Sequence, residues 1–111
     1  RLDHTLYNLR LLKRFHGVFQ ELKIITQLEQ IYFTKDGTIK LTADSQQPVA
    51  LLAFPKATIN SSGLEYNMNN LTLDFGTQES TSNSIVDKEA FVSVSGGCLL
   101  MISHKIKLAR T

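Results

Sequence analysis

The segment HTLYNLRLLKRFHGVFQELKIITQLEQ, residues 4–30, is a long amphipathic stretch near the start of the chain. It contains no proline and a single glycine, Gly17. Its apolar residues recur at the i, i+3, i+4, i+7 spacing of a helix that buries one face. These residues are Leu11, Leu12, Phe15, Val18, Phe19, Leu22 and Ile25. The spacing predicts one long amphipathic helix over about residues 4–30.

Two features of this segment leave alternatives open. Leu2, Leu6 and Leu9 fall on a face roughly opposite the main apolar stripe. A helix packed on its own domain needs one stripe, so these leucines either contact another molecule or fold back onto the same core through a bend. Gly17 costs about 1 kcal/mol relative to alanine in a helix interior, which indicates either a close packing contact or a break into two helices.

From Ile31 the pattern changes from helical spacing to the alternation of strands. Residues 31–33 are β-prone and lead into Asp36-Gly37, which is a strong hairpin signal. Residues 38–43 then alternate between polar and apolar, which places Ile39, Leu41 and Ala43 on one face.

The middle of the chain is predicted as strands joined by polar turns. Residues 49–54 form a continuous apolar run, which indicates a strand covered on both faces or a short buried segment. Residues 56–63 are predicted as a connection because they end in turn-forming residues. Residues 64–68 and 71–75 alternate, and Asn69-Asn70 between them predicts a second tight hairpin, since asparagine tolerates positive φ.

The last third of the chain is predicted as a loop followed by a third hairpin. Residues 76–84 contain no apolar residue and are expected to form an exposed, mobile loop. Residues 85–95 and 98–104 are predicted strands, with Gly96-Gly97 as the turn between them. One helix followed by six or seven short antiparallel strands is an α+β architecture. We therefore expect a single domain over residues 1–111, with the helix packed on an antiparallel sheet formed by residues 31–108.

The composition is that of an ordinary globular domain. The 111 residues are 42% hydrophobic and 20% charged, and the net charge is +2. This charge is too small to predict binding to nucleic acid or to a membrane surface. The single cysteine, Cys98, cannot form an internal disulfide and is predicted to pack as a small apolar side chain.

No motif predicts catalysis, a cofactor or a metal site. The sequence has no glycine-rich phosphate loop, no metal-ligand spacing among its three histidines, and no pair of carboxylates placed as an acid and a base. His104 lies in a basic run and is predicted to be a solvated surface residue. We therefore expect a protein that is not an enzyme, with no catalytic, cofactor-binding or metal-binding residue.

The basic residues fall into two groups, one in the predicted helix and one near the end of the chain. They are Arg10, Lys13, Arg14, Lys105, Lys107 and Arg110. If the last strand packs beside the helix, these side chains form one positive patch that contacts DNA or a protein partner. Nucleic-acid binding normally adds exposed aromatic residues and more charge, so an ordinary solvated surface is the favoured interpretation.

The order of elements resembles the soluble part of type IV pilins and pseudopilins. The likeness rests on the helix with its second leucine stripe, the segment Phe54-Pro55-Lys56, and the turn Ser95-Gly96-Gly97 that leads into a short basic strand at residues 105–110. In layout the chain is most similar to a minor pseudopilin of the competence system of Gram-positive bacteria, the ComGD type. The resemblance extends over most of the chain, but it lies in the order of the elements rather than in residue identities.

This resemblance implies a structural function. The chain would be a subunit of a short filament for DNA uptake, anchored in the cell membrane before assembly by an apolar helix preceding Arg1, and exposed at the cell surface afterwards. Leu2, Leu6 and Leu9 would form the filament interface. The implied partners are other pilin subunits, and DNA as a weaker one, with no small-molecule substrate. The alternative is a non-enzymatic interaction module, such as a phage structural subunit or an adaptor.

Overall fold

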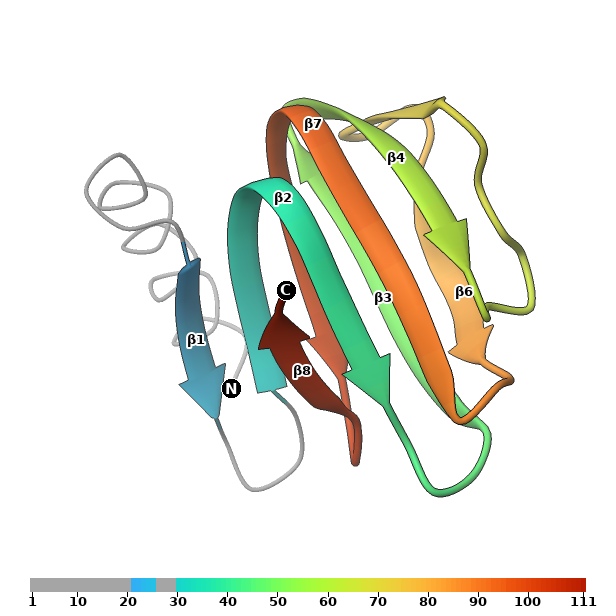
Figure 1. Ribbon diagram of the computed structural model, residues 1–111. Coiled ribbons are helices and arrows are strands. Elements are labelled where there is room, and N and C mark those ends of the chain that lie inside the picture. Colours follow the sequence, from blue (N-terminus) through green and yellow to red (C-terminus); the bar gives the residue numbers. More distant parts are fainter. Residues whose placement is uncertain (1–20, 26–29) are drawn as a thin grey trace.

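The computed structural model of the chain describes residues 21–25 and 30–111, and Figure 1 shows these residues as curved strands packed in two layers. Every regular element within those ranges is a β-strand. The strands are β1 (Glu21–Ile25), β2 (Gln30–Thr42), β3 (Gln47–Phe54), β4 (Lys56–Ser62), β5 (Leu71–Asp74), β6 (Ser80–Ile85), β7 (Glu89–Ser103) and β8 (Lys107–Arg110). Their pairings are antiparallel throughout.

Two long strands, β2 and β7, take part in both layers because each bends near its middle (Figure 1). The first layer has the order β1–β2–β7–β3–β6 and uses residues 30–35 of β2 and 98–103 of β7. In the second layer, β8 and β4 flank residues 37–42 of β2 and 89–95 of β7. β5 pairs with the outer edge of β4. The pairing of β2 with β7 therefore joins the two layers.

The bend in β2 lies at Asp36-Gly37, where the register with β7 shifts between Lys35 and Gly37. Gly37 has a φ of 141°, which favours glycine. The Arg110 guanidinium covers this bend, donating to Thr34 Oγ1 at 2.8 Å and to the carbonyl oxygens of Lys35 and Asp36. The predicted hairpin is wrong because both halves of β2 pair with β7 rather than with each other. Asp36-Gly37 lies at a register shift inside one strand, where one residue of β2 is opposite three residues of β7.

The bend in β7 lies at Gly96-Gly97, and the predicted third hairpin is also wrong. Residues 85–95 and 98–104 were expected to pair with each other, but residues 89–94 and 98–103 each pair with β2. A Cβ atom on Gly97 would collide with the backbone carbonyl oxygen of Lys56. The close approach of β7 to β4 therefore requires glycine at this position.

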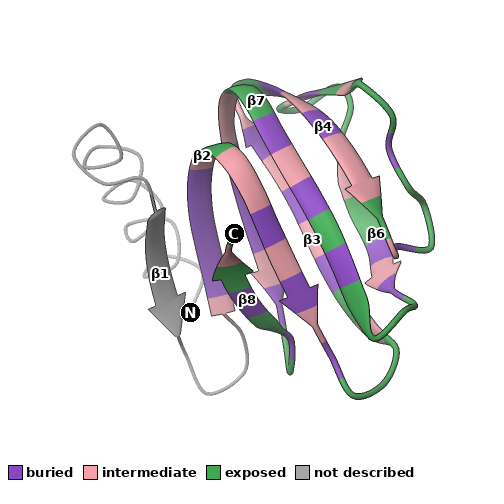
Figure 2. Ribbon diagram, in the orientation of Figure 1, coloured by how far each residue is buried: buried purple, intermediate pink, exposed green. Residues whose placement is uncertain are grey.

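The main core fills the space between the two layers. Buried and exposed residues alternate along the strands in Figure 2, as expected when one face of each strand is covered. The largest fully buried side chains of this core are Tyr32, Ile39, Leu41, Leu51, Ile59, Leu73, Ile85, Leu99, Met101 and Ile106. The predicted shared face of Ile39, Leu41 and Ala43 is confirmed, since all three are buried here. Full burial of a leucine or isoleucine contributes about 1.5–3 kcal/mol.

A second apolar cluster lies on the other face of the first layer. Phe33 and Leu100 are buried in it, and Phe54 and Cys98 pack against them. The ring centroids of Phe33 and Phe54 are 6.1 Å apart. Two predictions are confirmed: the apolar run that forms β3 has apolar contacts on both faces, and Cys98 packs among apolar side chains.

The α+β prediction is wrong for the residues that the structure describes. Glu21–Ile25, expected to continue the helix, form β1 and pair with residues 30–34 of β2. A short apolar pattern does not distinguish helix from strand, and Ile24-Ile25 favours a strand once a neighbouring strand is available. The rest of the predicted helix, residues 4–20 and 26–29, lies outside the described residues. In ranges 21–25 and 30–111 there is no helix with the length and hydropathy needed to cross a bilayer.

Candidate functional site

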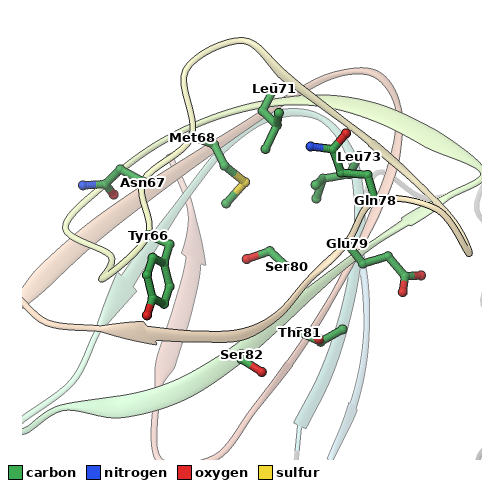
Figure 3. Close-up of a pocket in the computed structure, with 10 residues that line it drawn as sticks. All are labelled: Tyr66, Asn67, Met68, Leu71, Leu73, Gln78, Glu79, Ser80, Thr81 and Ser82. Atoms are coloured by element: carbon green, nitrogen blue, oxygen red, sulfur yellow. The ribbon is translucent and has the colours of Figure 1, made fainter.

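A pocket of about 470 Å³ opens between the loop of residues 63–70, β5 and the start of β6. This volume lies in the range of small-molecule sites. Its lining, drawn in Figure 3, consists of Tyr66, Asn67, Met68, Leu71, Leu73, Gln78, Glu79, Ser80, Thr81 and Ser82. The lining combines apolar side chains, one aromatic ring and several hydroxyl groups. Such a mixture can hold an organic ligand by contact area and orient it by hydrogen bonds.

Side-chain hydrogen bonds hold the loop of residues 63–70 in place. The Leu64 N–H donates to Asn67 Oδ1 at 3.0 Å. The Met68 N–H donates to Ser61 Oγ at 2.8 Å, and the Ser61 N–H donates to the Met68 carbonyl oxygen at 2.9 Å. Because these side chains replace the missing strand partners, the loop has a defined shape without being part of the sheet.

The predicted local structure around this loop needs three corrections. The second hairpin is wrong because β5 pairs with β4 rather than with residues 64–68. β4 itself was expected to be a connection. Part of the predicted mobile loop forms β6, which pairs with β3. Asn70 does adopt a positive φ of 50°, but in a connection that does not form the predicted tight hairpin. The polar residues of β6 form a strand because β3 supplies the pairing, a long-range contact that their local pattern does not indicate.

Tyr66 stands at one side of the pocket with 63% of its surface exposed. Met68 and Ser80 lie between Tyr66 and the pair Leu73 and Gln78 in Figure 3. Among the described residues, Tyr66 is the most exposed of the large hydrophobic side chains. The face of the ring is available to a flat or cationic ligand.

The charge of the pocket is negative. Among the described residues that line it, Glu79 is the one with a formal charge. Its Oε1 accepts a hydrogen bond from the Gly76 N–H at 3.1 Å. The lining therefore contains no lysine or arginine that could bind a phosphate group, and it suits a neutral or positively charged ligand.

A second pocket of about 460 Å³ has a different character. Its lining comprises Gln30, Thr42, Ala43, Asp44, Lys105, Ile106 and Lys107. Charged and polar side chains make up most of it, and no aromatic residue is among them. It offers less to an organic ring than the Tyr66 pocket does.

The structure describes three of the six basic residues that were considered for a positive patch. Lys105 and Lys107 are exposed near the end of the chain, and His104 beside them is exposed as predicted. Arg110 is half-buried, with its guanidinium on the carbonyl oxygens of the β2 bend. Arg10, Lys13 and Arg14, together with Leu2, Leu6 and Leu9, lie outside the described residues. A contact role for any of these residues stays a prediction.

The pocket residues were not predicted as a site from the sequence. Tyr66 was interpreted as a strand residue, and Gln78 to Ser82 as an exposed loop. The available signal was the density of hydroxyl and amide side chains in residues 80–84, Ser-Thr-Ser-Asn-Ser. Such side chains often build local hydrogen-bonded structure, and loops built in this way commonly carry function.

Comparison with known proteins shows which family the residues around this pocket belong to. The family model described as thiamin pyrophosphokinase, vitamin B1 binding domain, matches residues 36–99, which is more than half of the chain. The chain belongs to this family. All ten residues that line the Tyr66 pocket fall inside the matched range.

Individual relatives agree with the family match. Thiamin pyrophosphokinase 1 of Caenorhabditis elegans is 29% identical over 107 residues, which cover 92% of this chain and 44% of that protein. The solved thiamine pyrophosphokinase of Bacillus subtilis superposes with a TM-score of 0.82 at 22% identity, covering 95% of this chain and 51% of that one. The solved thiamin pyrophosphokinase of Candida albicans superposes with a TM-score of 0.76 at 21% identity, covering 94% of this chain and 41% of that one. These structures establish the fold. The chain spans about half the length of the relatives it matches, or less.

The family membership overturns the pilin-like interpretation. The chain is not a pseudopilin or a subunit of a DNA-uptake filament, and the non-enzymatic alternative is not favoured, because its family is a domain of an enzyme. The predicted partners, pilin subunits and DNA without a small molecule, are wrong because the family is defined by its small-molecule ligand. The predicted location at the cell membrane and cell surface rested on the pilin resemblance alone and is wrong with it.

Proposed function

We propose that this chain is the vitamin-binding part of a thiamin pyrophosphokinase and that the Tyr66 pocket holds thiamine. One observation carries the proposal: every residue of the pocket lies within the range matched by the vitamin B1 binding domain. The second pocket lies partly outside that range, since Gln30 and residues 105–107 contribute to it.

The chemistry of thiamine fits the lining of the pocket. Thiamine has two flat rings, an aminopyrimidine and a positively charged thiazolium. The exposed face of Tyr66 can stack on a flat ring or attract the cation, and such contacts contribute about 0.5–2 kcal/mol. The hydroxyls of Ser80, Thr81 and Ser82 supply hydrogen-bonding groups for the amino group and ring nitrogens. Glu79 adds a negative charge that complements the thiazolium.

The complete reaction needs more than this pocket supplies. A pyrophosphokinase transfers a pyrophosphoryl group from a nucleoside triphosphate to an alcohol, here the thiamine hydroxyl, and the nucleoside monophosphate leaves. The pocket lining contains no basic side chain to hold the phosphates. In our proposal the nucleotide is held by a part of the enzyme that corresponds to the remaining half of the relatives.

Thiamine titration of the protein by isothermal calorimetry tests this proposal. We expect saturable binding and a Kd about tenfold or more higher in the Tyr66→Ala variant, because the ring contact is lost. Phe91→Ala is the matched control: Phe91 is also an exposed aromatic residue, at 37%, but it does not line the pocket. Its Kd is expected to change less than about twofold. A folded protein that takes up no thiamine, or equal losses in both variants, would contradict the proposal.

A further inference from the structure

Asn83 in β6 is a polar side chain buried beside the pocket, with 2% of its surface exposed. A buried amide is costly unless its donors and acceptors are paired. Oδ1 accepts hydrogen bonds from the N–H groups of Tyr66 at 3.0 Å and Ser84 at 2.9 Å. Nδ2 donates to the Tyr66 carbonyl oxygen at 2.8 Å and to Ser80 Oγ at 3.0 Å. The amide is therefore fully used, with two bonds at each end.

Two of these hydrogen bonds pair with the backbone of Tyr66 in the way that a neighbouring strand would. The N–H and the carbonyl of Tyr66 both pair with one amide, 17 residues away in sequence. The preceding residue is attached to the same strand, since the Glu65 N–H donates to the Ser84 carbonyl oxygen at 2.9 Å. The exposed ring of Tyr66 thus projects from a backbone that is fixed relative to β6.

The same amide reaches both sides of the pocket. Tyr66 and Ser80 are both lining residues, and Met68 lies between Tyr66 and the far side in Figure 3. Because Asn83 Nδ2 bonds the Tyr66 carbonyl oxygen and Ser80 Oγ together, it sets the spacing between the aromatic ring and the first hydroxyl of the lining. A ligand that contacts both groups gains affinity when that spacing is set beforehand.

We infer that Asn83 is a positioning residue for the vitamin: it does not line the pocket, but holds Tyr66 and Ser80 at the separation that thiamine requires. This inference rests on the proposed function and adds a specific residue to it. The variant Asn83→Asp keeps the shape of the side chain and the acceptor for the Tyr66 N–H. It replaces the Nδ2 donor with an oxygen that faces the Tyr66 carbonyl oxygen, so the pair repels.

Thiamine titration of Asn83→Asp is compared with Asn60→Asp as a matched control. Asn60 makes a similar amide pair with Asn70, through bonds of 2.9 and 3.1 Å, at the other end of the same loop. Neither residue lines the pocket. We expect the Kd for thiamine to rise about tenfold or more in Asn83→Asp and less than about threefold in Asn60→Asp. Urea unfolding of each variant confirms that the protein titrated is folded.

A double-mutant cycle separates positioning from a general structural effect. In a Tyr66→Ala background, Asn83→Asp is expected to raise the Kd by less than about threefold, because the group that it positions is gone. Should Asn83→Asp not fold, Asn83→Ser removes the paired bonds without adding a charge and enters the same cycle.

The possible outcomes distinguish the proposed thiamine binding from the positioning role of Asn83. If the unmodified protein binds no thiamine, the proposed function fails and this inference fails with it. If it binds thiamine but Asn83→Asp binds equally well, the inference fails and the proposed function stands. An equal loss with and without the Tyr66 ring also overturns the inference, since Asn83 would then act on the fold as a whole.

Discussion

Buried leucine, isoleucine and valine side chains hold the two layers that β2 and β7 join, whereas the pocket loop of residues 63–70 combines two buried apolar side chains with hydrogen bonds from amides and hydroxyls. The layers bury whole side chains, as Leu41 and Leu51 do at 0% exposure. The loop buries Leu64 and Met68 in the same core, and Ser61, Asn67 and Asn83 add hydrogen bonds to its backbone. A net hydrogen bond contributes about 1 kcal/mol, and a buried leucine contributes more. The comparison predicts that the loop hydrogen bonds contribute less to stability than the buried side chains do, and more to the shape of the pocket.

The largest effect on stability is expected at the bend of β7. Gly97→Ala places a Cβ against the Lys56 carbonyl oxygen, a backbone atom that cannot rotate away. We expect a loss of about 4 kcal/mol in the free energy of unfolding, measured by urea denaturation. Gly96→Ala is the matched control, since its Cβ meets nothing within 4 Å and only its φ of 71° is unfavourable. It is expected to cost about 1–2 kcal/mol, and equal losses would refute the close approach of β7 to β4.

The next effect tests whether the core between the layers dominates stability. Leu51→Ala empties a fully buried position of β3 and is expected to cost about 3 kcal/mol. Leu52→Ala, on the other face of the same strand and half-buried, is expected to cost about 1 kcal/mol. Urea unfolding compares the two variants. A larger loss of stability for Leu52→Ala would mean that the second apolar cluster, around Phe33 and Leu100, is the main core.

A third substitution tests the pocket loop. Ser61→Ala removes the acceptor of the Met68 N–H and is expected to cost about 1 kcal/mol of stability. Its Kd for thiamine is expected to rise several-fold, because Met68 lines the pocket. Ser62→Ala, at the adjacent exposed position, is the control and is expected to change neither quantity. A Ser61→Ala variant that loses stability but keeps full affinity for thiamine would show that this hydrogen bond does not shape the pocket.

The smallest effect is expected for a surface ion pair. Lys40 Nζ and Glu89 Oε1 lie 3.4 Å apart, with 38% and 53% of the side chains exposed. Lys40→Ala is expected to change the free energy of unfolding by about 0–1 kcal/mol, and less at high salt. A salt titration of the unfolding midpoint measures this change. A loss larger than that of Ser61→Ala would show that surface charge matters more here than the loop hydrogen bonds.

The sequence predicted the strands better than their connections. Alternation correctly placed Ile39, Leu41 and Ala43 on one buried face, and a strand covered on both faces was one of the two interpretations of the apolar run that forms β3. Asp36-Gly37 and Gly96-Gly97 carry the residues of hairpin turns, but both lie inside strands that bend. The sequence could not reveal this because the partner of each half is decided by pairing between β2 and β7, about 60 residues apart.

The site was missed for a related reason. Ser80 to Ser84 has no apolar residue, so its pattern resembles a solvated loop, yet β3 pairs with it and Asn83 is buried. Tyr66 lies 17 residues before Asn83, and nothing in the local pattern indicates that the two are bonded. Hydrogen bonds between distant polar side chains leave no periodic signal. The family match, rather than the sequence pattern, is therefore the basis for proposing thiamine as the ligand.

The location of the vitamin is tested most directly by a thiamine titration followed in the amide spectrum of the isotopically labelled protein. The account predicts chemical-shift changes concentrated in residues 65–68 and 78–83, around the Tyr66 pocket and its Asn83 support. Saturable changes centred instead on residues 105–107 and Gln30, at the second pocket, would contradict it.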